Sequence, residues 1–128
     1  MSGASPEAYV LLVEDDPDVG GLLRHYLESL GHRVVHAQTG EDALVQLAGE
    51  PPDVAVVDIL LPGVDGRAVV RALQSPSRPE RCRIVVTSIV DEDDQHVEVD
   101  AVLAKPFTRK DVVRALKQAG VPVGRYGS

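Results

Sequence analysis

Five short apolar runs, most of them rich in valine, recur along the chain, and segments with helical periodicity lie between them. The runs are residues 9–13, 33–37, 53–57, 83–87 and 101–104. Runs this short and nearly unbroken are typical of strands buried on both faces of a parallel sheet. Parallel strands need crossover connections, which the helical segments supply. The alternation therefore predicts an α/β fold with a doubly wound, five-stranded parallel sheet.

The helical segments are bounded by residues that favour helix ends. Asp16 and Pro17 suit the start of a first helix that stops at Gly31. Further helices are predicted from Thr39 to before Pro51, over residues 66–73, and from Thr108 to Gly120. Five strands joined in this order predict the flavodoxin-like arrangement, with strand order 2-1-3-4-5.

Length and composition limit the class of protein. The 128 residues suit one domain, which we assign to residues 9–120, with an N-terminal extension at 1–8 and a C-terminal tail or linker start at 121–128. No apolar run could span a bilayer and the N-terminus does not resemble a signal peptide, so we expect a cytoplasmic protein with no membrane partner. The net charge of −7 and the lack of Trp weigh against direct nucleic-acid binding.

Charged and hydroxyl side chains stand where the predicted strands end. They are Glu14 and Asp15 after the first strand, Asp58 at the end of the third, Thr87 at the end of the fourth and Lys105 after the fifth. Doubly wound sheets bind ligands at this edge. The three carboxylates suit a hard cation, for which Mg²⁺ is the best candidate. Asp58 could then form an acyl phosphate whose oxygens pair with Lys105 and the Thr87 hydroxyl.

The same residues lie in four segments that resemble the receiver domains of bacterial two-component response regulators. The segments are Leu11–Pro17, Asp53–Gly66, Val85–Ser88 and Leu103–Phe107, and the resemblance runs from about Tyr9 to Ala119. Each segment alone is a modest signal, but all four occur in order and each coincides with a predicted strand end.

The resemblance implies specific roles for these residues. Asp58 would be the phosphoacceptor, Thr87 the switch hydroxyl and Lys105 the lysine that pairs with the phosphoryl group, joined to Pro106 by a cis peptide bond. Asp15, Asp58 and the carbonyl of Leu60 would be metal ligands, and Glu14 would order the site. The apolar side chains of Leu60 and Ile89 would stand at its mouth, where we expect them to slow hydrolysis of the phosphorylated state.

The implied function is phosphorelay signalling without enzymatic turnover. A sensor histidine kinase or phosphotransfer protein would phosphorylate Asp58, and the resulting change would control an output protein or domain, with a homodimer as a further candidate assembly. An alternative is a receiver-like interaction module that acts independently of phosphorylation. A phosphatase with an aspartate nucleophile is disfavoured, because Leu60 stands where such enzymes carry a second aspartate.

Some residues depart from the family pattern or carry a simpler interpretation. The position of the family's switch aromatic holds Val102, so coupling through an aromatic ring cannot operate in its usual form. Residues 88–104 lack a clear amphipathic stripe, and we expect a fourth helix there to be short, irregular or missing, with residues 91–99 the least ordered part of the fold. The four histidines, at positions 25, 32, 36 and 96, are interpreted as surface or strand-edge residues.

Overall fold

The protein is described by a computed structural model that covers residues 8–61, 63, 65–75, 81–87 and 98–121. Five strands form one sheet: β1 (Tyr9–Val13), β2 (Arg33–Ala37), β3 (Val54–Asp58), β4 (Arg83–Thr87) and β5 (Ala101–Leu103). Four helices are described: α1 (Pro17–Ser29), α2 (Gly40–Gln46), α3 (Gly66–Leu73) and α4 (Arg109–Gln118). None of the helices in these ranges is long and apolar enough to cross a membrane.

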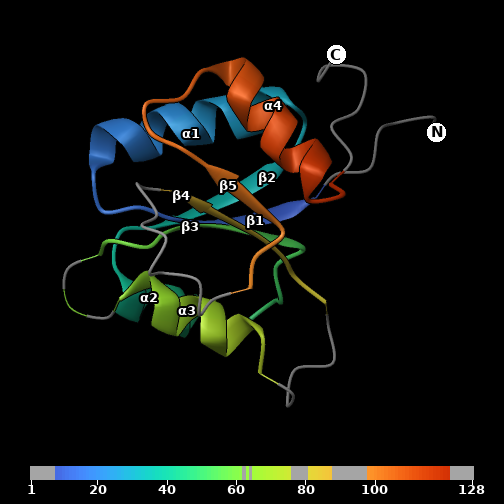
Figure 1. Ribbon diagram of the computed structural model, residues 1–128. Helices are drawn as coiled ribbons and strands as arrows, with labels where there is room; N and C mark the ends of the chain where they lie inside the picture. Colours follow the sequence, from blue (N-terminus) through green and yellow to red (C-terminus); the bar gives the residue numbers. More distant parts are fainter. Residues whose placement is uncertain (1–7, 62, 64, 76–80, 88–97, 122–128) are drawn as a thin grey trace.

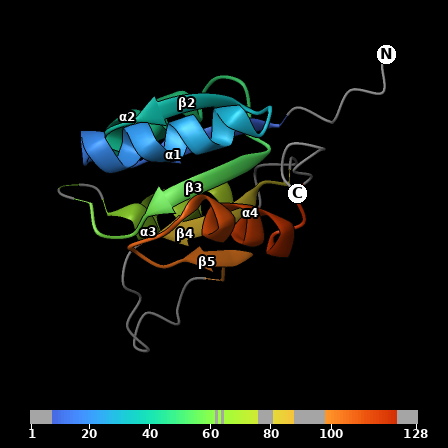
Figure 2. The same ribbon diagram turned by 90° about the horizontal axis from the view of Figure 1, so that it is seen from above.

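All strand pairs in the sheet are parallel, and the strand order is β2-β1-β3-β4-β5. Figure 2 shows β2 and β5 at the two edges of the sheet, with β3 and β4 between them. The doubly wound sheet and the strand order predicted from the sequence are therefore confirmed. The order places β1 and β3 at the centre, so the residues that follow these two strands meet at the switch point of the sheet.

Two hydrophobic layers hold the helices to the sheet. Helices α1 and α4 cover one face and α2 and α3 cover the other (Figure 1). Side chains alternate along each strand, so Val10 and Leu12 pack toward α1 while Leu11 and Val13 pack toward α2 and α3. Burial on both faces explains why these strands appear in the sequence as unbroken apolar runs.

The boundaries of the elements differ from the predicted ones in a few places. The third strand begins at Val54, one residue later than its apolar run, and ends at Asp58 as predicted, whereas the fifth ends at Leu103, one residue earlier than predicted. Helix α2 stops at Gln46, one turn short, where tighter bonds from Ala48 and Gly49 replace the helical pattern. The α3 bounds and the cis bond between Lys105 and Pro106 are confirmed.

The prediction for the histidines was wrong at one position. His32 is buried, at 5% exposure, and its Nδ1 accepts a hydrogen bond from the backbone N–H of Ala8 at 3.2 Å. The bond ties the connection after α1 to the residue before β1, a contact with no local signal in the sequence. His25 is exposed and His36 lies on the edge strand β2, as expected. The predicted fourth helix, the order of residues 91–97, and the side chains of Ile89 and His96 lie outside the described residues.

Candidate functional site

The site begins with residues at the carboxyl ends of the two central strands and of β4. Glu14 directly follows β1, while Asp58 and Thr87 end β3 and β4 and are register partners. Side chains at paired positions of parallel strands lie on the same face, which here is the face that α1 and α4 cover. All three side chains are buried, at 1% to 3% exposure. Burying charge in this way is costly unless partners are present.

Lys105, which follows β5, supplies one partner to two of these carboxylates. Its Nζ lies 2.9 Å from Oε1 of Glu14 and 3.2 Å from Oδ2 of Asp58. Burial alone would lower the pKa of Lys105, but the contacts with both carboxylates outweigh burial and raise it. The ammonium is therefore charged at neutral pH and lies where it could contact an anionic group bound to Asp58.

The acidic residues form a cluster of oxygen ligands. Carboxylate oxygens of Glu14, Asp15 and Asp58 all lie within 4.8 Å of one another. Burial is the main cause of the raised pKa of Glu14, and the nearby charge of Asp58 adds to the shift. Lys105 and the backbone N–H of Asp16 partly offset it. Asp15 is exposed, so the cluster opens to solvent on one side. Hard oxygen ligands in this number and spacing fit Mg²⁺.

The other two predicted residues lie beside this cluster. The backbone N–H of Leu60 donates to Oδ1 of Asp58 at 2.9 Å, which holds one carboxylate oxygen while Lys105 holds the other. The side chain of Leu60 is 61% exposed, consistent with a position at the mouth. The Thr87 hydroxyl is buried and has no hydrogen-bond partner among the described residues. A buried hydroxyl without a partner is costly, so a ligand oxygen in the site would satisfy it.

Residues outside the predicted set shape the loops of the site. A Cβ at Gly66 would overlap the carbonyl oxygen of Asp58, so only glycine lets α3 begin against the end of β3. The sequence had indicated only a helix entry at this position. His36, interpreted from the sequence as a strand-edge residue, contacts the backbone carbonyl of Glu14 at 2.8 Å through its Nε2.

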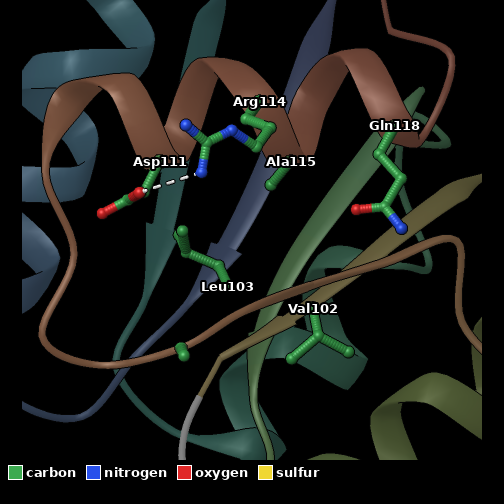
Figure 3. Close-up of a pocket in the computed structure, with 7 residues that line it drawn as sticks. Val102, Leu103, Asp111, Arg114, Ala115 and Gln118 are labelled. Carbon is green, nitrogen blue, oxygen red and sulfur yellow. Dashed lines mark ion pairs between the residues drawn. The ribbon is translucent and has the colours of Figure 1, made fainter.

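Two hollows are described, one beside the site lysine and one between β5 and α4. One of about 350 Å³ is lined by Val19, Leu22, Lys105, Pro106 and Phe107, so it adjoins the site lysine and is otherwise apolar. The other, of about 110 Å³, lies between β5 and α4 and includes Val102 and the Asp111–Arg114 ion pair (Figure 3). Val102 is 48% exposed at this second hollow.

Comparison with known proteins identifies the family. The family model described as the response regulator receiver domain matches residues 10–117 of the sequence, and the chain belongs to this family. Domains of this family act in two-component phosphorelay signalling, and this chain is therefore a receiver domain of that class.

Individual relatives agree with this assignment. The chain is 30% identical over 112 residues to the transcriptional regulatory protein BaeR of Escherichia coli O6:H1, covering 84% of the chain and 46% of BaeR. It thus spans about half the length of the first curated relatives it matches. Protein PilH of Pseudomonas aeruginosa is 30% identical over 105 residues, covering 82% of the chain and 87% of PilH.

The fold also matches solved receiver domains. The receiver domain of the sensor histidine kinase PA1611 from Pseudomonas aeruginosa PAO1 is 26% identical, with a TM-score of 0.78 over 90% of this chain and 99% of that one. Its structure carries a magnesium ion coordinated in the active-site cleft. The chemotaxis regulator CheY4 of Vibrio cholerae, at 24% identity, shares the fold with a TM-score of 0.80 over 89% of this chain and 99% of CheY4.

Proposed function

We propose that this receiver domain is a switch operated by phosphorylation of Asp58 in the presence of Mg²⁺. The observation that carries the proposal is the convergence on one sheet edge of a buried Asp58, the Lys105 ammonium and the buried Thr87 hydroxyl, which has no partner in the described part of the chain. Structural ion pairs rarely leave a buried hydroxyl without a partner beside them, whereas a phosphoryl oxygen would supply that partner. Modification occurs once per molecule, so the domain acts as an acceptor and not as an enzyme.

The chemistry follows from the positions of these groups. An oxygen of Asp58 attacks the phosphorus of the donor, an O–P bond forms, and the bond from phosphorus to the leaving nitrogen breaks. The leaving nitrogen then takes a proton. Lys105 pairs with one phosphoryl oxygen and Thr87 donates to another.

Glu14, Asp15 and Asp58 would hold Mg²⁺, together with the carbonyl of Leu60. The ion would offset the repulsion between the carboxylates and the phosphoryl group. The receiver domain of PA1611, which binds magnesium in its cleft, supports this part of the proposal.

A phosphohistidine protein is the proposed donor. Its phosphoryl group must reach Asp58, so its surface must cover the rim of the site. The apolar hollow beside Lys105, lined by Val19, Leu22 and Phe107, offers that rim a contact area. Output through a further domain, another protein or a second copy of the chain, and a cytoplasmic location, remain part of the proposal and rest on membership of the family.

Intact-mass measurement after incubation with phosphoramidate and Mg²⁺ tests the proposal. We expect one added phosphoryl group in the wild type and none in Asp58→Asn. Asp16→Asn is the matched control: it neutralises the neighbouring acid of the same loop, and asparagine still caps α1, so phosphorylation should continue. An unmodified wild-type mass would favour the alternative, an interaction module that works without phosphorylation.

A further inference from the structure

His36 is joined to the acidic site by a contact that the proposed chemistry does not use. Glu14 lies just past the end of β1, and its backbone N–H donates to the carbonyl of Ala37 at 3.1 Å. Its own carbonyl lies 2.8 Å from Nε2 of His36. A carbonyl can only accept, so Nε2 carries the proton and donates. The end of β2 therefore holds the backbone of Glu14 on both sides of its Cα.

The space for this imidazole depends on Gly20. The His36 side chain lies on the face of the sheet that α1 covers, as does that of Val34 two residues earlier. A Cβ at Gly20 would lie 2.6 Å from Nε2 of His36 and still closer to Cε1. Glycine is a poor residue for a helix interior. Its presence is explained by the imidazole, which fills the room that any larger residue would take.

The neighbouring glycine shows that this close contact is local. Gly21, the next residue of α1, has nothing within 4 Å of the position its Cβ would take. The two glycines therefore differ in their surroundings although they share one helix and one residue type. Gly21 provides a matched control for Gly20.

We propose that His36 is a positioning residue for the acidic site, holding the Glu14 backbone where its carboxylate can meet Asp15 and Asp58, with Gly20 providing the necessary space. The inference rests on the proposed function only in taking the site to bind Mg²⁺, because the contacts of His36 and Gly20 are observed in the structure. Strand β1 has ended at Val13, so the sheet ladder no longer fixes the carbonyl of Glu14. The imidazole supplies the missing donor, as groups outside a metal site commonly orient its ligands.

Substitutions at position 36 test the role of the donor. We expect His36→Leu to raise the Mg²⁺ dissociation constant about tenfold, the lower end of the effect of removing a group that orients a ligand. His36→Gln, whose amide nitrogen can take the place of Nε2, should restore most of the affinity. Val35→Ala on the same strand is the control for general loss of stability, because Val35 packs against the opposite layer. Equal dissociation constants for the wild type and His36→Leu would overturn the inference, as would equal losses in His36→Leu and His36→Gln.

The two glycines test the spatial half of the inference. Gly20→Ala should weaken Mg²⁺ binding, whereas Gly21→Ala should leave binding unchanged and raise the melting temperature. If Gly20→Ala acts by displacing the imidazole, it should have little further effect on Mg²⁺ binding in a His36→Ala background. Fully additive losses in the double variant would contradict a shared mechanism.

A measurement without metal separates this inference from the proposed function. In the Mg²⁺-free protein, the amide resonances of Glu14 and Asp15 should shift in His36→Leu and return toward the wild-type positions in His36→Gln. Long-range proton–nitrogen spectra should show Nε2 of His36 protonated. A wild type that binds no Mg²⁺ would contradict the proposed function alone, whereas unchanged Glu14 and Asp15 resonances in His36→Leu would overturn the positioning role.

Discussion

Glu14 is a residue whose buried charge lowers the stability of the folded protein. Its carboxylate is almost fully buried, and burial together with the charge of Asp58 raises its pKa above the ordinary value of 4.5. A raised folded-state pKa means that the folded protein disfavours the charged form more than the unfolded chain does. Stability is therefore lost as the pH rises from the ordinary value through the raised, folded-state value.

This leads to a prediction for the variant Glu14→Gln. In Mg²⁺-free buffer at pH 7, we expect this variant to melt a few degrees above the wild type, because glutamine has a shape similar to that of glutamate but carries no charge to bury. It should also lose most of the increase in melting temperature that Mg²⁺ gives the wild type. Thermal unfolding with and without Mg²⁺ measures both effects. Glu28→Gln, which removes an exposed charge paired with Arg24, is the control and should change little.

The positions of the candidate site residues were predictable from the sequence, whereas the residues that contact or surround them from distant segments were not. Strand ends carry the former, so Asp58, Thr87 and Lys105 could be placed from the apolar runs that precede them. His32, His36 and Gly20 act through contacts between segments far apart in the chain. Such contacts depend on how a helix packs on a sheet, which no local pattern records.

Among the elements, α4 has the most complete start. Thr108 accepts a hydrogen bond from the backbone N–H of Asp111 at 3.3 Å, and the Asp111 carboxylate accepts one from the backbone N–H of Thr108 at 2.8 Å. The two bonds form a capping box, the motif typical of an acid three residues after a threonine. They also lower the pKa of Asp111 below its ordinary value of 3.8, with its backbone bond to Thr108 the main cause.

The capping box predicts an acid-dependent contribution to stability. The folded-state pKa of Asp111 is depressed, so its contribution is present above the ordinary value of 3.8 and is lost as the pH falls through the lower, folded value. Asp111→Asn should lower the urea midpoint at pH 7, and the difference from the wild type should shrink as the pH falls below 3.8. Asp42→Asn tests the same position in α2, where the described contacts show only the Thr39 half of the box. An equal, pH-independent loss in both variants would contradict this account.

Helix starts were predictable where a capping residue marks them. Helix α3 starts after Asp65, whose side chain accepts from Arg67, and the predicted range was correct. Helix α2 has a clear start at Thr39, but its apolar spacing continues to Leu47, one residue past the last helical one. The apolar pattern reports which side chains are buried, and Leu47 stays buried as the C-cap, so the pattern could not show where the backbone leaves the helix.

At the scale of the whole molecule, the site and the apolar hollow share one edge of the sheet. We therefore predict that a substitution in the hollow changes the rate of phosphorylation by a protein donor but not by a small-molecule donor. A phosphohistidine protein that phosphorylates the wild type should transfer its phosphoryl group to Leu22→Ser about tenfold more slowly. This is the effect of losing about 1.4 kcal/mol of binding free energy. Phosphorylation by phosphoramidate should be unchanged, since Leu22 lines the hollow and is not one of the residues proposed to hold the phosphoryl group or Mg²⁺. Transfer rates to the two variants Leu22→Ser and Val45→Ser, the latter an exposed residue of α2, give the comparison. Equal rates in both would exclude the hollow as the docking surface.

Among the described residues of the site, three carboxylates face one ammonium, and this imbalance has a consequence for the order in which ligands bind. The formal charges of Glu14, Asp15 and Asp58 exceed that of the Lys105 ammonium by two among these described residues, on a protein that is itself acidic overall. A phosphate donor is also an anion, and the field of the metal-free protein repels it before any contact forms. A divalent cation cancels that surplus. Binding should therefore be sequential, with the cation first and the anion second, and the free cation concentration would set how fast the domain can receive a signal.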